Sequence, residues 1–472
     1  MKQNTFRRNF YYSLGFLLVF MTNAFAQSPD KMEWWKDAKF GMFMHWGLYS
    51  QTAGYWKGHV AKGNEHFMIH EKISLKEYAT IADDFNPVNY DAEKWVLTAK
   101  AAGMKYIIIT SKHHDGFAMF DSPSNDYNIK TRTPYAKDPM TELVAACHKH
   151  DMKFGFYYSL GRDWEDPDVA TDWPFKGGRS NLVDYPDEDI KVYSRYFERK
   201  VKPQIKELLT QYGKIDVIWF DTPELISPEE SKELRELILE LQPECIINSR
   251  IKHGFGDYKV KEQEIVEGLE VEPWEACITM GKNWGYIEYD TIYKPSELMT
   301  RQLLEIVSKG GNLLLNNGPT AKGEITDLAQ ARLAEMGIWI KQNSEGIYGS
   351  KPWRVQGERL VATPKENGKV KFSEEKNTMK DNEHDGTSKV IFPEVRFTSK
   401  YGAVYAYVCS VTDKEIVIKA LALENGDKIK SITRLNTTDK VKWKQTKTGL
   451  TIKVPVYTAT EIPITGFKIE LK

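Results

Sequence analysis

Short apolar runs alternate with longer amphipathic stretches between residues 31 and 350. The apolar runs are almost continuous, which is typical of parallel strands that are buried on both faces. We expect strands at residues 40–46, 104–110, 153–159, 215–221, 245–248 and 312–316. Strands that alternate with helices predict βα repeats, and we interpret residues 27–350 as the (β/α)8-like barrel domain of an α/β protein.

The stretches between the strands carry apolar residues at helical spacing. Helices are expected at residues 93–102, 139–151 and 189–212. The last of these has one apolar face, formed by Ile190, Tyr193, Phe197, Val201, Ile205 and Leu208. Ser227 is followed by Pro228 and Glu230. This is the pattern of a capping box with proline at the first helical position, so another helix should begin there.

The pattern changes after residue 351. Segments 404–411, 414–423, 450–456 and 467–471 alternate apolar and polar residues, as half-buried antiparallel strands do. The dipeptide Asn425-Gly426 lies between two of them and predicts a tight hairpin. The polar stretch 373–389 predicts an exposed loop. We therefore interpret residues 351–472 as a C-terminal β-sandwich domain.

Residues 1–26 have the pattern of a secretory signal peptide. Lys2, Arg7 and Arg8 precede an apolar run at residues 10–21, and small residues precede a cleavage site after Ala26. The apolar run is shorter than the ~20 residues that a membrane span requires. We expect an exported protein without a membrane span, located in the periplasm or outside the cell.

The charge balance argues against two classes of partner. The chain has 65 basic and 66 acidic residues, which give a formal net charge of −1, and it has no long basic block. Neither nucleic acid nor an anionic membrane surface is therefore expected as a partner. The four cysteines show no CxxC spacing, so we expect free buried thiols rather than a disulfide framework: Cys147, Cys245, Cys277 and Cys409.

Polar residues follow five of the predicted strands at the point where each strand ends. These endings are residues 45–46, 111–117, 157–159, 221 and 248–250. In a parallel barrel, reactive side chains gather at the carboxyl ends of the strands and in the loops that follow them. We therefore predict a pocket at this face of the barrel.

Asp221 directly follows an apolar strand, where an unpaired carboxylate is costly to bury. One interpretation is an N-cap for the next helix. The other is a nucleophile for glycosyl transfer, which needs an ionised carboxylate on a rigid element. Arg250 follows a neighbouring strand and would help to keep Asp221 ionised.

Three histidines at strand ends, His45, His113 and His114, also have more than one interpretation. Each could be a core residue satisfied by backbone hydrogen bonds, a ligand for hydroxyl groups, or a metal ligand. The chain has neither an HxH nor an HExxH pattern at these positions. We predict no metal site and no cofactor.

Four segments carry specific motifs: residues 40–47 (FGMFMHWG), 111–117 (SKHHDGF), 219–221 (WFD) and 310–316 (GGNLLLN). These segments resemble, in sequence and in order, the motifs of the α-L-fucosidases of glycoside hydrolase family 29. With Trp274-Glu275 and Trp284-Gly285-Tyr286, the resemblance covers residues 31–350.

The resemblance implies a retaining hydrolase that releases terminal α-L-fucose from oligosaccharides or glycoconjugates through a covalent fucosyl-enzyme intermediate, without a cofactor. Asp221 of the Trp-Phe-Asp motif is the implied nucleophile. The residues implied to bind the substrate are His45, Glu65, His113, His114, Tyr157, Trp219, Arg250 and Trp284. The fucose methyl group needs an apolar contact, which Trp219 or Phe67 could supply.

The resemblance leaves two candidates for the general acid/base. Glu262 precedes Gln263 in a segment similar to the acid/base loop of bacterial members, and we favour it. Glu275 of the Trp-Glu motif is the alternative, whereas Glu264 and Glu267 are interpreted as solvated loop residues. In a retaining enzyme the acid/base should lie ~5–5.5 Å from the nucleophile.

The chain departs from the family's pattern at three places. Glu65-His66-Phe67 stands where Glu-Trp-Tyr is frequent, Ser249 stands where Asp is frequent, and Asn317 replaces an apolar residue. These changes leave the leaving-group preference open, and the loop 163–174 could face either the leaving group or solvent. Two other functions also remain open: a non-catalytic fucose-binding protein on the same fold, and a metal-dependent hydrolase built on the histidines. The sequence does not give the oligomeric state.

Overall fold

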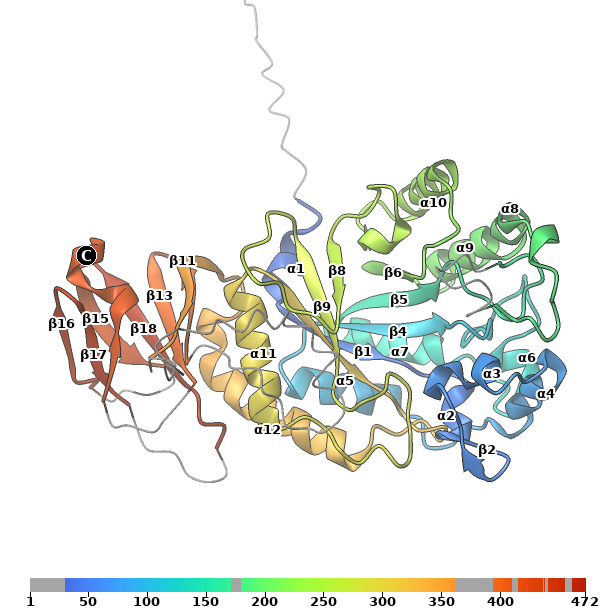
Figure 1. Ribbon diagram of the computed structural model, residues 1–472, viewed down its shortest axis with the longest axis horizontal. Helices are drawn as coiled ribbons and strands as arrows, with labels where there is room; N and C mark the ends of the chain where they lie inside the picture. The colour runs from blue at the N-terminus through green and yellow to red at the C-terminus, as the bar shows by residue number, and fades with distance from the viewer. Residues whose placement is uncertain are drawn as a thin grey trace, which may run out of the picture. The chain divides into compact units, whose positions relative to one another are not determined.

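The computed structural model of the protein describes residues 30–170, 180–360, 394–409, 415–435, 437, 440–454 and 461–472. The barrel strands and their helices come first in the chain, and the C-terminal strands follow (Figure 1). The predicted signal peptide, residues 1–26, and the predicted loop 373–389 lie outside the described residues. No helix in the described ranges is long and apolar enough to cross a bilayer.

Eight parallel strands form the sheet of the first domain, in the order β7-β6-β5-β4-β1-β10-β9-β8. The six predicted strands are confirmed as β1 (Phe40–Met44), β4 (Tyr106–Lys112), β5 (Lys153–Ser159), β6 (Val217–Asp221), β7 (Ile246–Ile247) and β10 (Asn312–Asn317). The sequence pattern does not predict β8 (Lys259–Glu262) and β9 (Trp274–Thr279). The described residues on either side of β8 contain no crossover α-helix, so the alternation that reveals βα repeats is missing there.

The two edge strands of this sheet meet and close it into a barrel. Asn248, directly after β7, forms a parallel bridge with Tyr258, directly before β8. The Ser249 N–H donates to the Tyr258 carbonyl at 2.7 Å, and the Asp257 N–H donates to the Ile247 carbonyl at 2.7 Å. The predicted barrel-like fold is therefore confirmed, and the junction between β7 and β8 is short.

Helices pack around the barrel. The longer ones are α5 (Ala92–Ala101), α7 (Pro139–Lys149), α9 (Lys202–Thr210), α10 (Pro228–Leu241), α11 (Ser296–Ser308) and α12 (Asp327–Asn343). Shorter elements are α1 (Glu33–Ala38), α2 (Tyr49–Thr52), β2 (Tyr55–Trp56), β3 (His59–Val60), η1 (Asn64–His66), α3 (Phe67–His70), α4 (Leu75–Ala79), η2 (Thr80–Asp84), α6 (Ile129–Arg132), η5 (Ser249–Ile251) and η6 (Ser344–Gly346). The capping box that begins α10 is confirmed, because the Ser227 side chain accepts from the Glu230 N–H and the Glu230 side chain accepts from the Ser227 N–H.

The predicted helix at residues 189–212 is not continuous. It consists of η3 (Glu188–Ile190), α8 (Tyr193–Tyr196), a π-helical turn at Phe197–Val201, labelled η4, and α9. Ile190 lies before α8 and is 67% exposed, so its assignment to the apolar face is wrong. The π-helical turn adds a residue to the helical repeat and rotates the face that follows it.

The C-terminal domain is a sandwich of two antiparallel sheets, as predicted. The larger sheet contains, in order, β11 (Lys351–Glu358), β12 (Val395–Lys400), β13 (Ala403–Val408), β18 (Thr465–Leu471) and β15 (Ile429–Arg434). The smaller contains β14 (Glu415–Ile418), β17 (Gly449–Lys453) and β16 (Trp443–Thr446). Phe397, Val404 and Phe467 of the larger sheet share one core with Ile418 and Ile452 of the smaller.

The hairpin predicted at Asn425-Gly426 is wrong. β14 and β15, on either side of this dipeptide, belong to different sheets of the sandwich. Residues Leu423–Asn425 form a 3-10 turn that Gly426 ends with a φ of 90°. The dipeptide therefore signals a change of chain direction, but the strands that it joins pair with other partners.

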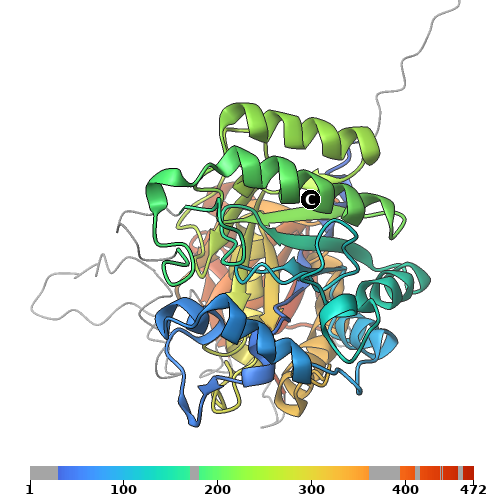
Figure 2. The same cartoon turned by 90° about the vertical axis from the view of Figure 1, so that its right-hand side faces the viewer.

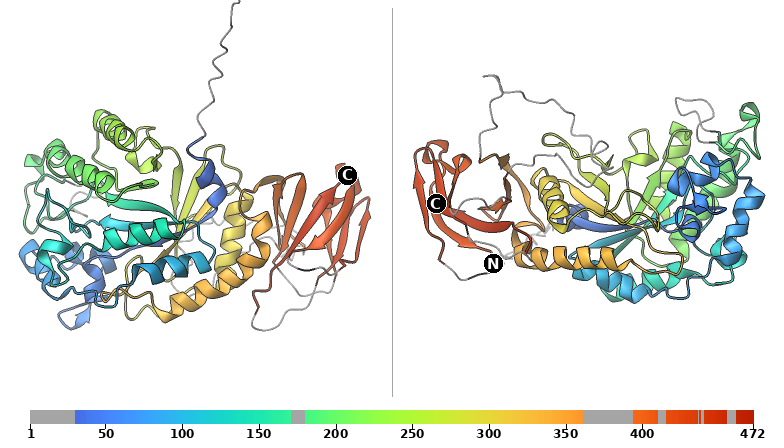
Figure 3. Two further views of the ribbon diagram at one scale, coloured as in Figure 1. Left: turned by 180° about the vertical axis from the view of Figure 1, so that it is seen from behind. Right: turned by 60° about the horizontal axis from the view of Figure 1, so that its bottom comes forward.

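The larger C-terminal sheet also packs against the barrel helices, which Figure 3 shows from behind and from below. Tyr405 and Tyr407 of β13 belong to the barrel core rather than to the sandwich core. Trp339 of α12 donates its indole N–H to the Ile464 carbonyl at 2.8 Å, and Arg396 of β12 is paired with Glu305 of α11. All four cysteines are free and buried, as predicted.

Candidate active site

A pocket of about 520 Å³ opens at the carboxyl ends of the barrel strands. Figure 2 looks onto this side of the molecule, where the loops after the strands gather. Ten of the eleven predicted site residues line the pocket: His45, Glu65, His113, His114, Tyr157, Trp219, Asp221, Arg250, Glu262 and Trp284. The eleventh, Glu275, lies outside the pocket lining.

Asp221 is the last residue of β6, and both of its carboxylate oxygens are hydrogen-bonded. The Tyr157 hydroxyl donates to Oδ2 at 2.7 Å, the Thr222 backbone N–H donates to Oδ1 at 2.8 Å, and the Arg250 guanidinium also contacts Oδ1. The next helix, α10, is capped by Ser227 instead. The N-cap interpretation of Asp221 is therefore wrong, and its partners are those of an ionised carboxylate held in the pocket.

Opposing effects act on the pKa of Asp221. Burial raises this pKa, whereas the positive charge of Arg250 and the hydrogen bond from Tyr157 lower it. The lowering effects win, and the net pKa lies below the usual value of 3.8. Asp221 is therefore ionised at neutral pH, as a nucleophile must be.

The backbone after Asp221 is strained in a way that serves this carboxylate. Thr222 has a φ of 51°, which is unusual for a β-branched residue. The loop after β5 approaches so closely that a Cβ at Gly161 would lie 2.1 Å from the Thr222 carbonyl oxygen. The strained turn aims the Thr222 N–H at Asp221, which is a form of preorganisation often found at active sites.

Aromatic rings form the floor of the pocket. The Trp219 ring lies 4.9 Å from the Phe43 ring and 5.5 Å from the Tyr157 ring, with which it stacks at 20°. The Arg250 guanidinium lies 5.0 Å from the Trp219 ring, and Trp284 lies 6.1 Å from Phe43. Such apolar ring faces suit the C–H surface and the methyl group of a deoxy sugar.

Phe67 does not contribute to this floor. It is buried and packs against Trp56 and Tyr78, so the expected contact with a fucose methyl group does not hold for this residue. Phe43 does belong to the floor, although the sequence pattern did not predict it. Because side chains two positions apart on a strand share one face, its place two residues before His45 is the signal that could have found it.

His45 presents a free hydrogen-bond acceptor. Its Nδ1 lies 2.7 Å from Oδ1 of Asn316, and Asn316 donates its amide N–H to the Trp284 carbonyl at 2.8 Å. Oδ1 of Asn316 is therefore the acceptor, so His45 carries its proton on Nδ1 and has an unprotonated Nε2. Burial lowers the pKa of His45 to about 4, which keeps the ring neutral.

His114 has the same arrangement. Ser159 Oγ donates to the Arg162 carbonyl at 2.8 Å and lies 2.7 Å from His114 Nδ1, so this nitrogen donates to Ser159. Nε2 of His114 lies 3.8 Å from Oδ2 of Asp221. Burial, followed by the neighbouring imidazole rings, lowers the pKa of His113 and of His114 well below 6.5. Neutral imidazoles with free nitrogens are ligands for hydroxyl groups.

Buried atoms without a hydrogen-bond partner within the described part of the chain include Oε2 of Glu65 and Nδ1 of His113, two of the lining residues. Both residues are buried, and burial raises the pKa of Glu65 to about 7. Because buried polar atoms are nearly always hydrogen-bonded, unpaired ones in a pocket lining point to a polar ligand.

Glu262, the last residue of β8, reaches the rim of the pocket. Its Oε2 lies 2.5 Å from Nη2 of Arg250, and its side chain is 47% exposed. The other terminal nitrogen of the same guanidinium contacts Asp221. Because the two carboxylates share one planar guanidinium, they lie close together.

Glu275 lies deeper, near the start of β9, with no exposed surface. It accepts hydrogen bonds from the Tyr106 hydroxyl at 2.6 Å and from the Trp219 indole N–H at 2.9 Å. Burial raises the pKa of Glu275 to about 7. Glu275 therefore supports the floor residue Trp219 from the barrel interior and does not face a ligand in the pocket.

The pocket lining also contains residues that were not predicted as site residues: Phe43, His66, Arg162, Thr222, Pro223, Glu224, Gln263 and Cys277. Most of them lie in loops, whose path above the barrel cannot be read from periodicity. His66, noted as a departure from the family pattern, has its ring 5.1 Å from the His114 ring. Among the residues that the structure describes, no three His, Cys, Asp or Glu side chains are arranged to hold a metal ion.

A parallel barrel with two neighbouring carboxylates at its mouth, an aromatic floor and neutral imidazoles is the arrangement of a glycoside hydrolase. Comparison with known proteins gives the family. The model for "Alpha-L-fucosidase" matches residues 21–345, and the model for "Alpha-L-fucosidase C-terminal domain" matches residues 388–472. The chain belongs to the α-L-fucosidase family and is a hydrolase of α-L-fucosides.

Individual relatives agree with this assignment. The tissue α-L-fucosidase of Mus musculus is 33% identical over 351 residues, which cover 69% of this chain and 73% of the relative. α-L-Fucosidase isoenzyme 1 from Paenibacillus thiaminolyticus is 31% identical with a TM-score of 0.78, and the match covers 94% of this chain and 99% of that chain. α-L-Fucosidase AlfC from Lactobacillus casei is 36% identical with a TM-score of 0.63, covering 66% and 98%.

Proposed function

We propose that the enzyme hydrolyses terminal α-L-fucosides with retention of configuration, with Asp221 as nucleophile and Glu262 as general acid/base. The observation that carries this proposal is the placement of Arg250. Its two terminal nitrogens contact Asp221 and Glu262, respectively. Carboxyl groups held this close fit the ~5–5.5 Å separation of retaining enzymes better than the ~6.5–9.5 Å of inverting ones, which must admit a water molecule.

The reaction proceeds in two displacements. In the first, Asp221 attacks the anomeric carbon while protonated Glu262 gives its proton to the glycosidic oxygen, so the leaving group departs as an alcohol. In the second, Glu262 takes a proton from water, and the resulting attack on the anomeric carbon releases Asp221 and fucose. The unprotonated Nε2 atoms of His45 and His114 accept hydroxyl protons of the sugar, and the aromatic floor contacts its methyl group.

Glu262 is preferred over Glu275 for a geometric reason. A general acid must lie within hydrogen-bond reach of the atom that it protonates. Glu262 reaches the pocket, whereas both oxygens of Glu275 are occupied by Tyr106 and Trp219 in the barrel interior. We assign Glu275 the role of a positioning residue for Trp219.

Trapping of the intermediate tests the nucleophile. A fluorinated fucosyl fluoride slows the second displacement more than the first, so a covalent adduct should accumulate. We expect peptide mass spectrometry to locate this adduct on Asp221, and NMR of early product to show α-L-fucose. An adduct on another side chain, or β-L-fucose as first product, would overturn the proposal.

The substrates are fucosylated oligosaccharides or glycans. A variant of AlfC has been solved in complex with Fuca(1,6)GlcNAc, and we propose that a fucosyl disaccharide of this type also fits the pocket described here. We further propose that the enzyme is exported, because residues 1–26 have the pattern of a signal peptide. Native protein isolated from the periplasm or medium should begin at Gln27, and an intact N-terminus in cytoplasmic fractions alone would contradict export.

A further inference from the structure

One ion pair in the pocket lining is not used by the proposed mechanism. Arg162, in the loop after β5, donates from Nη2 to Oε1 of Glu224, in the loop after β6, at 2.7 Å. Both residues line the pocket, and Arg162 is only 5% exposed. Nε of Arg162 and Oε2 of Glu224 have no partner within the described ranges. Arg162 is buried and Glu224 is half-buried, and the hydrogen-bonding capacity of the pair is incompletely used without a ligand.

This pair follows the strand ends that carry the pocket floor. Ser159 and Asp221 end β5 and β6, and Arg162 and Glu224 each follow three residues later. Side chains at the strand ends form the floor, and Arg162 and Glu224 line the same pocket from the loops that leave it. Glu262, which protonates the departing oxygen in the proposed mechanism, lines this pocket as well.

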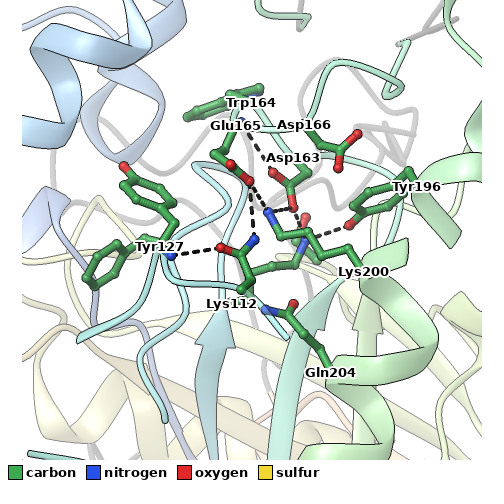
Figure 4. A network of polar contacts seen from close by, with 12 residues as sticks. Lys112, Tyr127, Asp163, Trp164, Glu165, Asp166, Tyr196, Lys200 and Gln204 are labelled. Carbon is green, nitrogen blue, oxygen red and sulfur yellow. Dashed lines mark hydrogen bonds and ion pairs between the residues drawn. The ribbon is translucent and has the colours of Figure 1, made fainter. Parts of the chain in front are cut away.

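A buried polar network anchors the residues that directly follow Arg162 in its loop, and Figure 4 shows this network. Lys112 of β4 and Lys200 of the π-helical turn both contact Oδ2 of Asp163, at 2.9 and 2.8 Å. Lys200 also contacts Glu165 at 2.5 Å, and Lys112 donates to the Tyr196 hydroxyl at 2.6 Å. Asp163 and both lysines are buried, so the start of the loop 163–174 is not the solvated surface considered above.

Two further contacts fix the geometry of the pair. The Trp164 N–H donates to the His114 carbonyl at 2.8 Å, which ties this loop to the histidine pair. Lys252 Nζ donates to the Glu224 carbonyl at 2.9 Å, which ties down the loop after β6. Binding groups held by such supporting contacts lose little freedom when a ligand arrives.

We propose that Arg162 and Glu224 form the leaving-group subsite and bind a hydroxyl group of a neutral sugar. A hydroxyl placed between them accepts from the guanidinium and donates to the carboxylate. Because the charges of the pair cancel, the subsite favours a neutral polyhydroxylated ring over an acidic or a cationic one. This inference rests on the proposed mechanism only for the direction in which the leaving group departs.

The test compares two substrates in one set of variants. A neutral fucosyl disaccharide can use the subsite, whereas an aryl fucoside has no leaving-group hydroxyls to bind there. The variants are Glu224→Gln and the double variant Arg162→Gln/Glu224→Gln. The measured quantity is the ratio of kcat/KM for the disaccharide to kcat/KM for the aryl fucoside. In both variants this ratio should fall about 10–100-fold, which is the effect of losing a hydrogen bond to a charged group. The double variant keeps a neutral amide pair and so leaves no unpaired buried charge.

Glu297→Gln is the matched control, because Glu297 forms an ion pair with Arg301 on α11, remote from the pocket lining. It should leave the ratio at the wild-type value. An unchanged ratio in both folded subsite variants would overturn the proposal, and this includes an equal loss of kcat/KM on the two substrates. A covalent adduct of the fluorinated fucosyl fluoride on a residue other than Asp221 would instead refute the catalytic assignment. Failure of the subsite proposal and failure of the proposed function are therefore distinguishable.

Discussion

Asp221→Ala should lower kcat/KM for an aryl fucoside on the order of 10⁴-fold, a loss typical of removing a principal catalytic group from a hydrolase. Asp221 is ionised by Arg250 and Tyr157 and ends a rigid strand. Alanine leaves the pocket in place but removes the proposed nucleophile. Steady-state kinetics with a chromogenic substrate measures this loss.

Azide distinguishes a lost nucleophile from a damaged fold. In Asp221→Ala the side chain's place is open, and azide can attack the anomeric carbon from the face that Asp221 used. The expected product is β-fucosyl azide, identified by NMR, with recovery of part of the lost rate. The control is Asp126→Ala, which removes an exposed ion pair with Arg132 and should keep full activity. A folded Asp221→Ala variant that forms no azide product would count against the nucleophile assignment.

Glu262→Ala should show a loss that depends on the leaving group. For a fucosyl disaccharide, whose departing alkoxide needs a proton, we expect a loss of ~10²–10⁴-fold, the usual contribution of general acid catalysis. For an aryl fucoside with an activated leaving group, the first displacement needs little protonation and should be affected much less. Comparing single-turnover rates on the two substrates measures this difference.

Glu275→Gln is the matched control for Glu262. The amide oxygen can still accept from the Trp219 indole, and the amide nitrogen can donate to the Tyr106 hydroxyl, so the support of Trp219 is retained. This variant should keep most of the activity, whereas Glu275→Leu should lose activity to the same extent on both substrates. A leaving-group-dependent loss in Glu275→Gln, together with none in Glu262→Ala, would exchange the two assignments.

The pH dependence of stability gives Glu275 a second readout. Burial raises its folded-state pKa to about 7 from the usual 4.5, so the native state keeps a proton that the unfolded state has lost between these values. Stability from this group is therefore present below pH 4.5 and is lost as the pH rises towards 7. The quantity to compare is the free energy of unfolding of Glu275→Gln minus that of wild type. This difference should rise by up to about 3 kcal/mol from pH 4 to pH 8. Denaturant titrations at the two pH values check this, and a constant difference would refute it.

Part of the site follows from the sequence pattern alone. The residues at strand ends converge as expected, because parallel strands bring their carboxyl ends to one face whatever the details of packing. Glu275 shows the limit of motif reasoning. Its motif suggests a catalytic acid, but a position at the beginning of β9 places the carboxyl in the barrel interior, beneath Trp219. The position of a residue along its strand decides whether its side chain faces the pocket or the barrel interior. This position cannot be read from the types of the neighbouring residues.

The ion pair of Arg162 and Glu224 is a stronger case of the same limit. The residues lie 62 positions apart, and their pairing depends on two loops that approach within contact at Gly161 and Thr222. Loops have no periodicity from which such an approach follows. Strands β8 and β9 went unpredicted for a related reason, since no α-helix lies in the described chain between β7 and β9 to mark βα repeats.

The amino-acid sequence by itself determined the parallel barrel, the sandwich after it, the face on which the pocket opens and the identity of Asp221 as its central carboxylate. Hydrophobic periodicity is local, and the geometry of parallel strands turns that local pattern into a common face. Only the tertiary structure decided which glutamate accompanies Asp221, which nitrogen of each histidine is free, and which loop residues form the rim. These depend on contacts between residues far apart in the chain, where burial and hydrogen-bond partners are set by the packed fold.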